Sequence, residues 1–408
     1  MHDSPPSDAR MERSLRLLPY WWVLRWAWLG EAIWVVYLVE TRGLTIGQIL
    51  LFDAVFFASS LLSEVPTGVV ADRYGRRTSM LSGSLVISAG FIVFALADIL
   101  PVLLTAYVLF GIGTALMSGA DDAYLFDALR AVGRVREFPA VAGRLNAMMT
   151  LAVAGFTIIG GLMATVTPLS WPIVASGVLS IMAASLAFRL DEPPRDPGSA
   201  ADSFLATGLS ASRRVLRMPS LRWAATLGAL PWVAGFAAFT VWQPVLIGYE
   251  VPVGAFGWVA AAMMLVAAVG GWSANWFSQR LGIGGALLVL PVIGAIALLG
   301  GSGGLLWFVP LFGLAPFAQN ALHPISTVYI SRRVPDSERA TALSFQQFGA
   351  QFTTIFVMLS LSALVSRVAL GHALAGTSAL LLTITIVCWL LWRRAGDREL
   401  APGEDDDA

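Results

Sequence analysis

The sequence predicts an all-α membrane protein with twelve transmembrane helices in two pseudo-symmetric six-helix bundles. Composition gives the first indication: 57% of the 408 residues are hydrophobic and 13% are charged, whereas soluble domains are about one quarter charged. Mean hydropathy is +0.73. The number of apolar segments is the second indication, and the placement of arginine is the third. Because a spanning helix needs about 20 apolar residues, this length allows a dozen spans joined by short loops.

Twelve apolar segments follow one another along the chain. Their ranges are 19–40, 47–71, 78–97, 101–120, 145–166, 171–190, 221–247, 255–277, 283–299, 305–330, 340–365 and 373–392. A polar stretch that contains Pro193, Pro194 and Pro197 separates the sixth segment from the seventh. The predicted organisation is an N-terminus (1–18), an N-terminal bundle (19–190), a linker (191–220), a C-terminal bundle (221–392) and a tail (393–408).

All 26 basic residues are arginine, and their placement predicts the orientation. On the twelve-segment map, 23 arginines fall in the termini, the linker and the loops of one side. Two, Arg42 and Arg367, fall on the other side, and Arg25 lies within the first segment. Because arginine is enriched in cytoplasmic loops, we expect both termini to be cytoplasmic in a multi-pass protein of a bacterial plasma membrane.

Composition also excludes several classes of protein. Without lysine the chain has neither a Walker A loop nor a Schiff-base lysine, so it carries no ATP-driven motor of that type. A net charge of zero argues against nucleic-acid binding. Cys388 is the single cysteine, so no intrachain disulfide or cysteine metal cluster forms. We expect no enzymatic activity, no metal and no cofactor.

The stretch GVVADRYGRR resembles the signature of the major facilitator superfamily, G-x-x-x-D-R-x-G-R-R, between the second and third helices. Each signature position matches, namely Gly68, Asp72, Arg73, Gly75, Arg76 and Arg77. Physical chemistry suggests a role for each type of residue. Glycine permits close helix approach, a carboxylate accepts hydrogen bonds at a helix N-terminus, and arginines pair with carboxylates.

The end of the eighth segment, GGWSANWFSQR, is a degraded second copy. Aligning Gly271 with Gly68 places Asn275 on Asp72, Ser278 on Gly75 and Arg280 on Arg77. Two six-helix halves are what the facilitator fold requires. A narrower resemblance, carried by EVPTGVVADRYGRR, SGADDAYLFDAL and PDSERATALS, is to a bacterial branch whose members are described as drug-efflux permeases.

Two positions depart from the family pattern. The arginine of the fourth helix, which the family associates with proton coupling, falls at Tyr107. The antiporter signature of the fifth helix keeps Gly160 and Gly161, while its Gly-Pro pair falls on Phe156 and Thr157. Both departures weaken an assignment as a standard proton antiporter and leave the fold prediction unchanged.

Charged groups inside a span are costly and usually functional. Glu31 lies about 12 residues into the first segment, hence roughly 18 Å deep, and is the first candidate for proton coupling. Burial raises the pKa of a carboxyl group toward neutrality. The alternative is a static partner for Arg25 or for a polar group of another helix. Asp53 and His323 are further candidates, with contact to interfacial water and hydrogen-bonded packing as their respective alternatives.

The signature residues belong to a predicted cytoplasmic gate together with four carboxylates of the second and fourth helices. These carboxylates are Glu64, Asp121, Asp122 and Asp127, and pairing with Arg73, Arg76 or Arg77 would close the gate. A solvated helix end is the alternative. Gly271, Asn275 and Arg280 form the second-half copy. Polar and aromatic residues of the spans are the candidates for the substrate cavity: Arg25, Trp34, Trp242, Gln243, Gln319, Asn320 and Gln347.

These observations and the resemblance predict a secondary transporter that exports small lipophilic or amphiphilic compounds by alternating access, coupled to protons. Its partners are a small-molecule substrate, protons and the lipid bilayer, and we expect a monomer. One alternative is an importer or uncoupled facilitator of a small polar metabolite. Another is a non-transporting membrane sensor or scaffold, in which Glu31 and the gate carboxylates can be neutralised without loss of activity.

Overall fold

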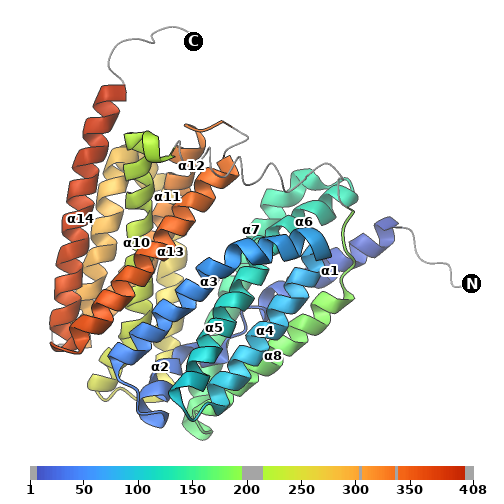
Figure 1. Cartoon of the computed structure of the whole chain (residues 1–408), viewed down its shortest axis with the longest axis horizontal. Helices are drawn as coiled ribbons and strands as arrows, with labels where there is room; N and C mark the ends of the chain where they lie inside the picture. The colour runs from blue at the N-terminus through green and yellow to red at the C-terminus, as the bar shows by residue number, and fades with distance from the viewer. Residues whose placement is uncertain (1–6, 195–214, 303–305, 336–338, 400–408) are drawn as a thin grey trace, which may run out of the picture. The chain divides into compact units, whose positions relative to one another are not determined.

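A computed structural model describes residues 7–194, 215–302, 306–335 and 339–399. Within these ranges the chain is helical and has no strand (Figure 1). The longer helices are α1 (Ser7–Leu24), α3 (Ile46–Tyr74), α4 (Arg76–Leu96), α5 (Leu100–Met117), α6 (Ala120–Ala131), α7 (Phe138–Val166), α8 (Ser170–Arg189), α10 (Pro219–Gly248), α11 (Val253–Ala297), α12 (Leu314–Ser331), α13 (Arg339–Val365) and α14 (Leu370–Glu399). Nine helices of the described ranges are long and apolar enough to cross a membrane, or ten if a bent pair is one span. The all-helical membrane class is therefore confirmed.

The chain forms two compact units. Unit 1 contains α1 to α8 together with residues 247–262, and unit 2 contains α10 up to Leu246 and the chain from Met263 onward. Most of the predicted linker, residues 195–214, lies outside the described residues, as do residues 1–6 and 400–408.

The first apolar segment is not the continuous helix that we predicted. Helix α1 ends at Leu24, and a 3-10 turn, η1 (Leu29–Ala32), then leads into α2 (Trp34–Val36) and a π-helical turn, η2 (Tyr37–Thr41). The part of the segment up to Ala32 and the part from Trp34 to Thr41 are bent by 48° relative to each other. Irregular backbone inside a membrane needs protein partners for its polar groups. Here the amide of Gly30 donates to Ser176 Oγ of α8 at 3.3 Å.

Gly160 of α7 provides the space for this irregular segment. A Cβ atom at Gly160 would lie 1.7 Å from the carbonyl oxygen of Leu29. Because no side chain tolerates that distance, the turn η1 packs directly on the backbone of α7. The glycine that remains from the antiporter signature therefore has a packing role in unit 1.

Small residues also set the packing among the other helices of unit 1, where α4 packs against α5 and α8, and α3 against α5. A Cβ at Gly111 of α5 would lie 1.9 Å from Ser59 Oγ of α3. Ser88 of α4 donates to the carbonyl of Gly177 in α8 at 2.9 Å. Close approach at glycine and serine is how helices associate in lipid, where no hydrophobic driving force exists between them.

The predicted eighth and ninth helices form one element, α11, with a break at Gly282. Gly282 has φ 63° and ψ 178°, which is a non-helical conformation inside the 45-residue element. At about 1.5 Å per residue that length is roughly 68 Å, more than twice the hydrocarbon thickness of a bilayer. The tenth predicted segment begins with a 3-10 helix, η5 (Leu306–Gly313), which continues into α12.

Replacing Gly160 by alanine should lower the melting temperature of the purified protein in detergent, because the added methyl group displaces η1 from α7. Gly155→Ala is the matched control on the same helix, since a Cβ there meets no atom within 4 Å. Alanine gains about 1 kcal/mol of helix propensity over glycine, so the control should melt at the wild-type temperature or above it. Equal melting temperatures for the two variants would contradict the packing role of Gly160.

Candidate functional site

Charged residues of unit 1 gather in one region, which we call the charged end. It comprises Ser14, Arg25, Gly75–Arg77, Asp121–Asp127 and Asp191–Glu192. Its deepest interaction is an ion pair between Arg25 and Asp121, whose side chains are 10% and 8% exposed. Arg25 is the residue directly after the end of α1, and its guanidinium lies 4.5 Å from the ring centre of Trp22. Asp121 stands in the first turn of α6, where the helix dipole favours a negative charge.

A second ion pair joins Arg76 of α4 to Asp127 of α6. The same guanidinium also donates to the carbonyl oxygen of Ala123. We predicted that the aspartates of this region pair with the signature arginines. Asp127 does pair with the signature arginine Arg76, whereas Asp121 pairs with Arg25, and a gating role for either aspartate stays a prediction. Both pairs join elements of unit 1, so neither has to break when unit 1 moves as a body.

The carboxylate of Glu192 caps helix α4. It accepts hydrogen bonds from the backbone amides of Arg76 at 2.7 Å and Arg77 at 2.9 Å. Gly75 precedes these amides with φ 111° and ψ 150°, a conformation that is essentially restricted to glycine. A Cβ at Gly75 would also lie 2.7 Å from the Glu192 carboxylate. The second signature glycine is therefore required both by its backbone conformation and by the capping carboxylate.

Two further interactions tie the start of the linker to this end. Tyr124 of α6 donates its hydroxyl to the carbonyl oxygen of Asp191 at 2.7 Å, and the amide of Asp191 donates to Ser14 Oγ of α1 at 2.9 Å. Arg77 donates to the carbonyl of Ala187 at 3.3 Å, near the end of α8. Sequence reasoning missed Ser14, Asp191 and Glu192. The acidic pair directly after the sixth segment was the available signal.

Other members of the predicted gate lie on the surface of unit 1. Asp72, Arg73 and Asp122 are exposed, and the guanidinium of Arg73 lies 5.6 Å from the ring of Tyr74. Gly68 is also exposed, and a Cβ there would meet no described atom within 4 Å. No described part of unit 1 packs on Gly68, and the close helix approach expected there stays a prediction. Glu64 is half-buried on the same helix.

Glu31 lies in the turn η1, between Gly30 and Ala32, both of which are buried. This turn contacts α7 and α8. An aromatic cluster adjoins it: the ring centres of Trp28 and Trp34 are 6.1 Å apart, and those of Trp34 and Tyr107 are 6.5 Å apart. The structure thus places the principal coupling candidate in irregular backbone, where a side chain can reorient without breaking a continuous helix.

Tyr107 occupies the position of the family's arginine and is buried in this cluster. Its ring centre lies 5.3 Å from that of Phe52. Its hydroxyl forms no hydrogen bond within the described part of the chain. Asp53 of α3, the residue after Phe52, is half-buried.

In unit 2, two glycines of α10 make room for glutamines of neighbouring helices. A Cβ at Gly228 would lie 2.4 Å from Nε2 of Gln346 in α13, and one at Gly235 would lie 2.6 Å from Oε1 of Gln319 in α12. Gln346 donates to Ser326 Oγ at 3.2 Å. The cavity candidate Gln319 thus packs against the α10 backbone.

The remaining candidates of unit 2 differ in exposure. Trp242 and Gln243 are buried within α10, whereas Asn320, His323 and Gln347 are exposed. Asn320 donates to the carbonyl of Ala267 at 3.1 Å.

The second copy of the signature lies along α11, and Asn275 accepts a hydrogen bond from Gln279 at 3.3 Å. The helix continues past Ser278, which aligns with Gly75, and breaks at Gly282 instead. Arg280 is exposed. The second copy of the signature therefore occupies the equivalent place after the eighth predicted helix, but it lacks the helix break that Gly75 makes in the first copy.

Spanning-length helices, a bent first span and buried ion pairs in the described ranges define a multi-pass membrane protein. The sequence matches the Major Facilitator Superfamily over residues 25–315 and 249–407, and the chain belongs to this family. It is similar to the enterobactin exporter EntS of Escherichia coli O127:H6, with 28% identity over 263 residues, or 61% of this chain and 57% of that protein. The alignment thus spans little more than half of the relative. It is also similar to the uncharacterised MFS-type transporter YxaM of Bacillus subtilis, with 30% identity over 23% of each chain.

Solved structures with the same fold cover nearly the whole chain. A mutant of the nucleoside transporter NupG has a TM-score of 0.75 at 12% identity and covers 94% of this chain and 99% of that one. A bacterial homologue of the human lysosomal transporter Spinster, inward-facing and occupied, has a TM-score of 0.71 at 17% identity, with 95% and 97% covered. At these identities the likeness defines the fold.

Neutralising Asp121 should destabilise the protein far more than neutralising Asp122. Asp121→Asn leaves the buried guanidinium of Arg25 without its carboxylate, which typically costs about 3–5 kcal/mol. Asp122 is exposed, so Asp122→Asn should change stability by less than about 0.5 kcal/mol. Melting temperatures in detergent measure both. If the Arg25→Gln, Asp121→Asn double variant melts no higher than Asp121→Asn alone, the ion pair is not the cause.

Because the Glu192 carboxylate caps α4 beside Gly75, the effects of mutating Glu192 and Gly75 on stability should depend on each other. Glu192→Ala removes the cap and should cost about 1 kcal/mol. Gly75→Ala alone should cost more, because the methyl group meets the carboxylate in addition to the backbone strain. In the Glu192→Ala background part of that cost should disappear. Additive losses in a double-mutant cycle of melting temperatures would show that the two residues do not interact.

Proposed function

We propose that the chain is a twelve-span secondary transporter of the inner membrane that exports small lipophilic or amphiphilic compounds. The observation that carries export is the similarity to a relative named as an enterobactin exporter. The sequence resemblance to drug-efflux permeases supports the same direction. Alternating access about a midplane site is the mechanism that the family architecture favours.

The count of twelve is supported by the lengths of the described helices. The bent first segment counts as one span, α11 as two on either side of Gly282, and η5 with α12 as one. The remaining spans are α3, α4, α5 with α6, α7, α8, α10, α13 and α14. We assign six spans to each of two bundles, in a monomer with cytoplasmic termini, as the excess of arginine in alternate loops favours.

Proton coupling is assigned to Glu31. The support is its place in the turn η1, where the backbone is irregular and flanked by buried residues. A proton that falls through about 100 mV supplies roughly 2.3 kcal/mol, which sustains a gradient of about fiftyfold by the tenfold rule per 1.4 kcal/mol. Asp53 and His323 are the secondary candidates.

We assign the gating charges to the exposed members of the signature region, Asp72, Arg73 and Asp122, rather than to the buried ion pairs. The pairs of Arg25 with Asp121 and of Arg76 with Asp127 hold the elements of unit 1 together. A rigid unit with exposed charges on its surface is suited to a two-state movement.

An uncoupled facilitator is the second candidate function. Tyr107 stands where the family's proton-linked arginine is expected, and its buried ring is packed among aromatic side chains. If Tyr107 replaces the arginine without replacing its role, transport would run down the substrate gradient alone, in either direction.

Proton flux in proteoliposomes decides between the two. A pH-sensitive dye inside the vesicles would report proton movement when lipophilic cations, antibiotics, siderophores, sugars and organic acids are added, for wild type and for Glu31→Gln. Coupled export predicts flux triggered by a lipophilic or amphiphilic compound and lost in the variant. Glu40→Gln is the control, because Glu40 is exposed at the end of the same segment.

Substrate-driven flux that survives in Glu31→Gln would move the coupling site to Asp53 or His323. If no compound moves protons while labelled substrate still exchanges across the membrane, the uncoupled facilitator is correct. The absence of both would support the sensor or scaffold.

A further inference from the structure

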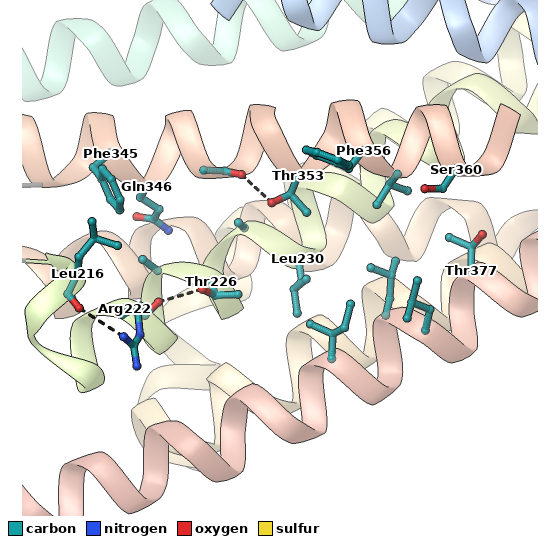
Figure 2. A pocket seen from close by; sticks show the side chains of 17 residues that line it. Leu216, Arg222, Thr226, Leu230, Phe345, Gln346, Thr353, Phe356, Ser360 and Thr377 are labelled. Carbon is teal, nitrogen blue, oxygen red and sulfur yellow. Dashed lines mark hydrogen bonds between the residues drawn. The ribbon is translucent and has the colours of Figure 1, made fainter. Parts of the chain in front are cut away.

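Unit 2 contains an elongated cavity of about 470 Å³ between α10, α13 and α14 (Figure 2). Its lining comes from α10 between Arg222 and Leu230, from α13 between Phe345 and Ser360, and from α14 between Thr377 and Ile384, with Leu216 at one end. Along α13 the lining extends over sixteen residues, from Phe345 to Ser360, which is roughly 24 Å at 1.5 Å per residue. The cavity is therefore a long slot inside one unit.

The walls of this slot are mostly apolar, and the threonine hydroxyls in them are already hydrogen-bonded. Leucine, phenylalanine, valine and alanine side chains form most of the lining. Three threonines also line it, but each donates its hydroxyl hydrogen to its own helix. Thr226 donates to the carbonyl of Arg222 at 3.0 Å, Thr353 to that of Gly349 at 2.7 Å, and Thr377 to that of Ala373 at 2.9 Å. The slot thus has few donors with which to bind a sugar or another polar metabolite.

Arg222 is the one charged residue of the lining, and no carboxylate accompanies it. Its guanidinium lies 4.6 Å from the ring of Trp223 and donates to the carbonyl of Leu216 at 3.5 Å. Its Nε is buried and has no hydrogen-bond partner among the described residues, where Arg222 also forms no ion pair. A partly buried guanidinium without a carboxylate favours an anionic partner.

The charged residue Arg222 lies at one end of the slot, and the apolar walls extend away from it. Figure 2 shows Arg222, Leu216, Phe345 and Gln346 at one end, and Ser360 and Thr377 at the other. Arg222 stands in the first turn of the spanning helix α10, and the slot runs from it along the spanning segments. Lipid headgroups and tails have the same order across half of a bilayer.

We propose that this slot binds one hydrocarbon chain of an anionic amphiphile, with the headgroup on Arg222 and the chain between α13 and α14. The shared chemistry is one negative head and one extended hydrocarbon chain, which either a free fatty acid or an acyl chain of an anionic phospholipid supplies. The lone arginine disfavours a cationic amphiphile. The inference concerns binding, so it holds whether or not the protein couples transport to protons.

Photolabelling of the purified full-length protein in nanodiscs of neutral lipid tests the site. The probe is a palmitic acid analogue with a diazirine near the end of its chain, and labelled peptides are located by mass spectrometry. The proposal predicts label in α13 and α14 segments between Gly349 and Ile384. Label confined to other segments would overturn it.

Two variants address the head and the chain separately. Arg222→Gln should lower the affinity for oleate, measured by competition with the probe, roughly tenfold or more, because a charge-assisted hydrogen bond is lost. Arg280→Gln is its control, as an exposed arginine of the same unit. Gly349→Leu should abolish labelling in the slot, because it adds a side chain where a Cβ meets no atom within 4 Å and the residue lines the cavity.

Gly396→Leu is the matched control for the second variant, since its Cβ position is equally open and lies outside the lining. Each variant is first checked for a monodisperse profile and a wild-type melting temperature. Unchanged labelling in a folded Gly349→Leu protein would reject the slot as the binding site.

Competitors identify the headgroup and the source of the chain. Oleate should compete and its methyl ester should not; equal competition would reject the role of Arg222. Displacement by phosphatidylglycerol at membrane concentrations but not by micromolar oleate assigns the slot to a lipid. Displacement by micromolar oleate alone assigns it to a free single-chain compound.

Discussion

The buried ion pair between Arg25 and Asp121 attaches the first span to α6 directly after α1 ends. An arginine within an apolar segment must find a carboxylate, and Asp121 lies 96 residues further along the chain. Arg25 follows directly after the last residue of α1, and the turn η1 begins four residues later. That turn needs a surface without side chains, which Gly160 provides. The position of Glu31 in irregular backbone follows from these two constraints.

A carboxylate outside the signature explains part of the signature itself. Gly75 is required because the Glu192 carboxylate occupies the space of its missing side chain and caps α4 through two amides. Arg76 and Arg77 are then held by α6 and by the end of α8. Several charges of the region are thus structural, and they make unit 1 a stable body. The charges available for contacts that change during transport are the exposed ones.

Unit 2 uses glycine differently. Gly228 and Gly235 make room for polar side chains of α12 and α13, so that glutamines pack beside the α10 backbone. The slot that starts at Arg222 adjoins this packing, because Gln346 also lines it. The three threonine hydroxyls of the lining donate to their own helices, so they offer no free donor to the slot.

Sequence alone determined the class, most helix positions and the family, because these depend on local properties. An apolar run of sufficient length forms a helix in lipid wherever its neighbours lie, as α3, α4, α7 and α8 illustrate. The pairing of Asp127 with a signature arginine was also predictable, since a short loop brings α3 and α4 together near α6.

Tertiary structure alone decided the break in the first span, the pairing of Arg25 with Asp121 and the cap by Glu192. Each depends on partners about one hundred residues apart, such as the 116 residues between Arg76 and Glu192. Hydrophobic periodicity carries no information about which distant polar group satisfies a buried charge or a freed amide. Only the packed arrangement of helices selects that partner, because the cost of an unpaired polar group in lipid depends on what lies beside it.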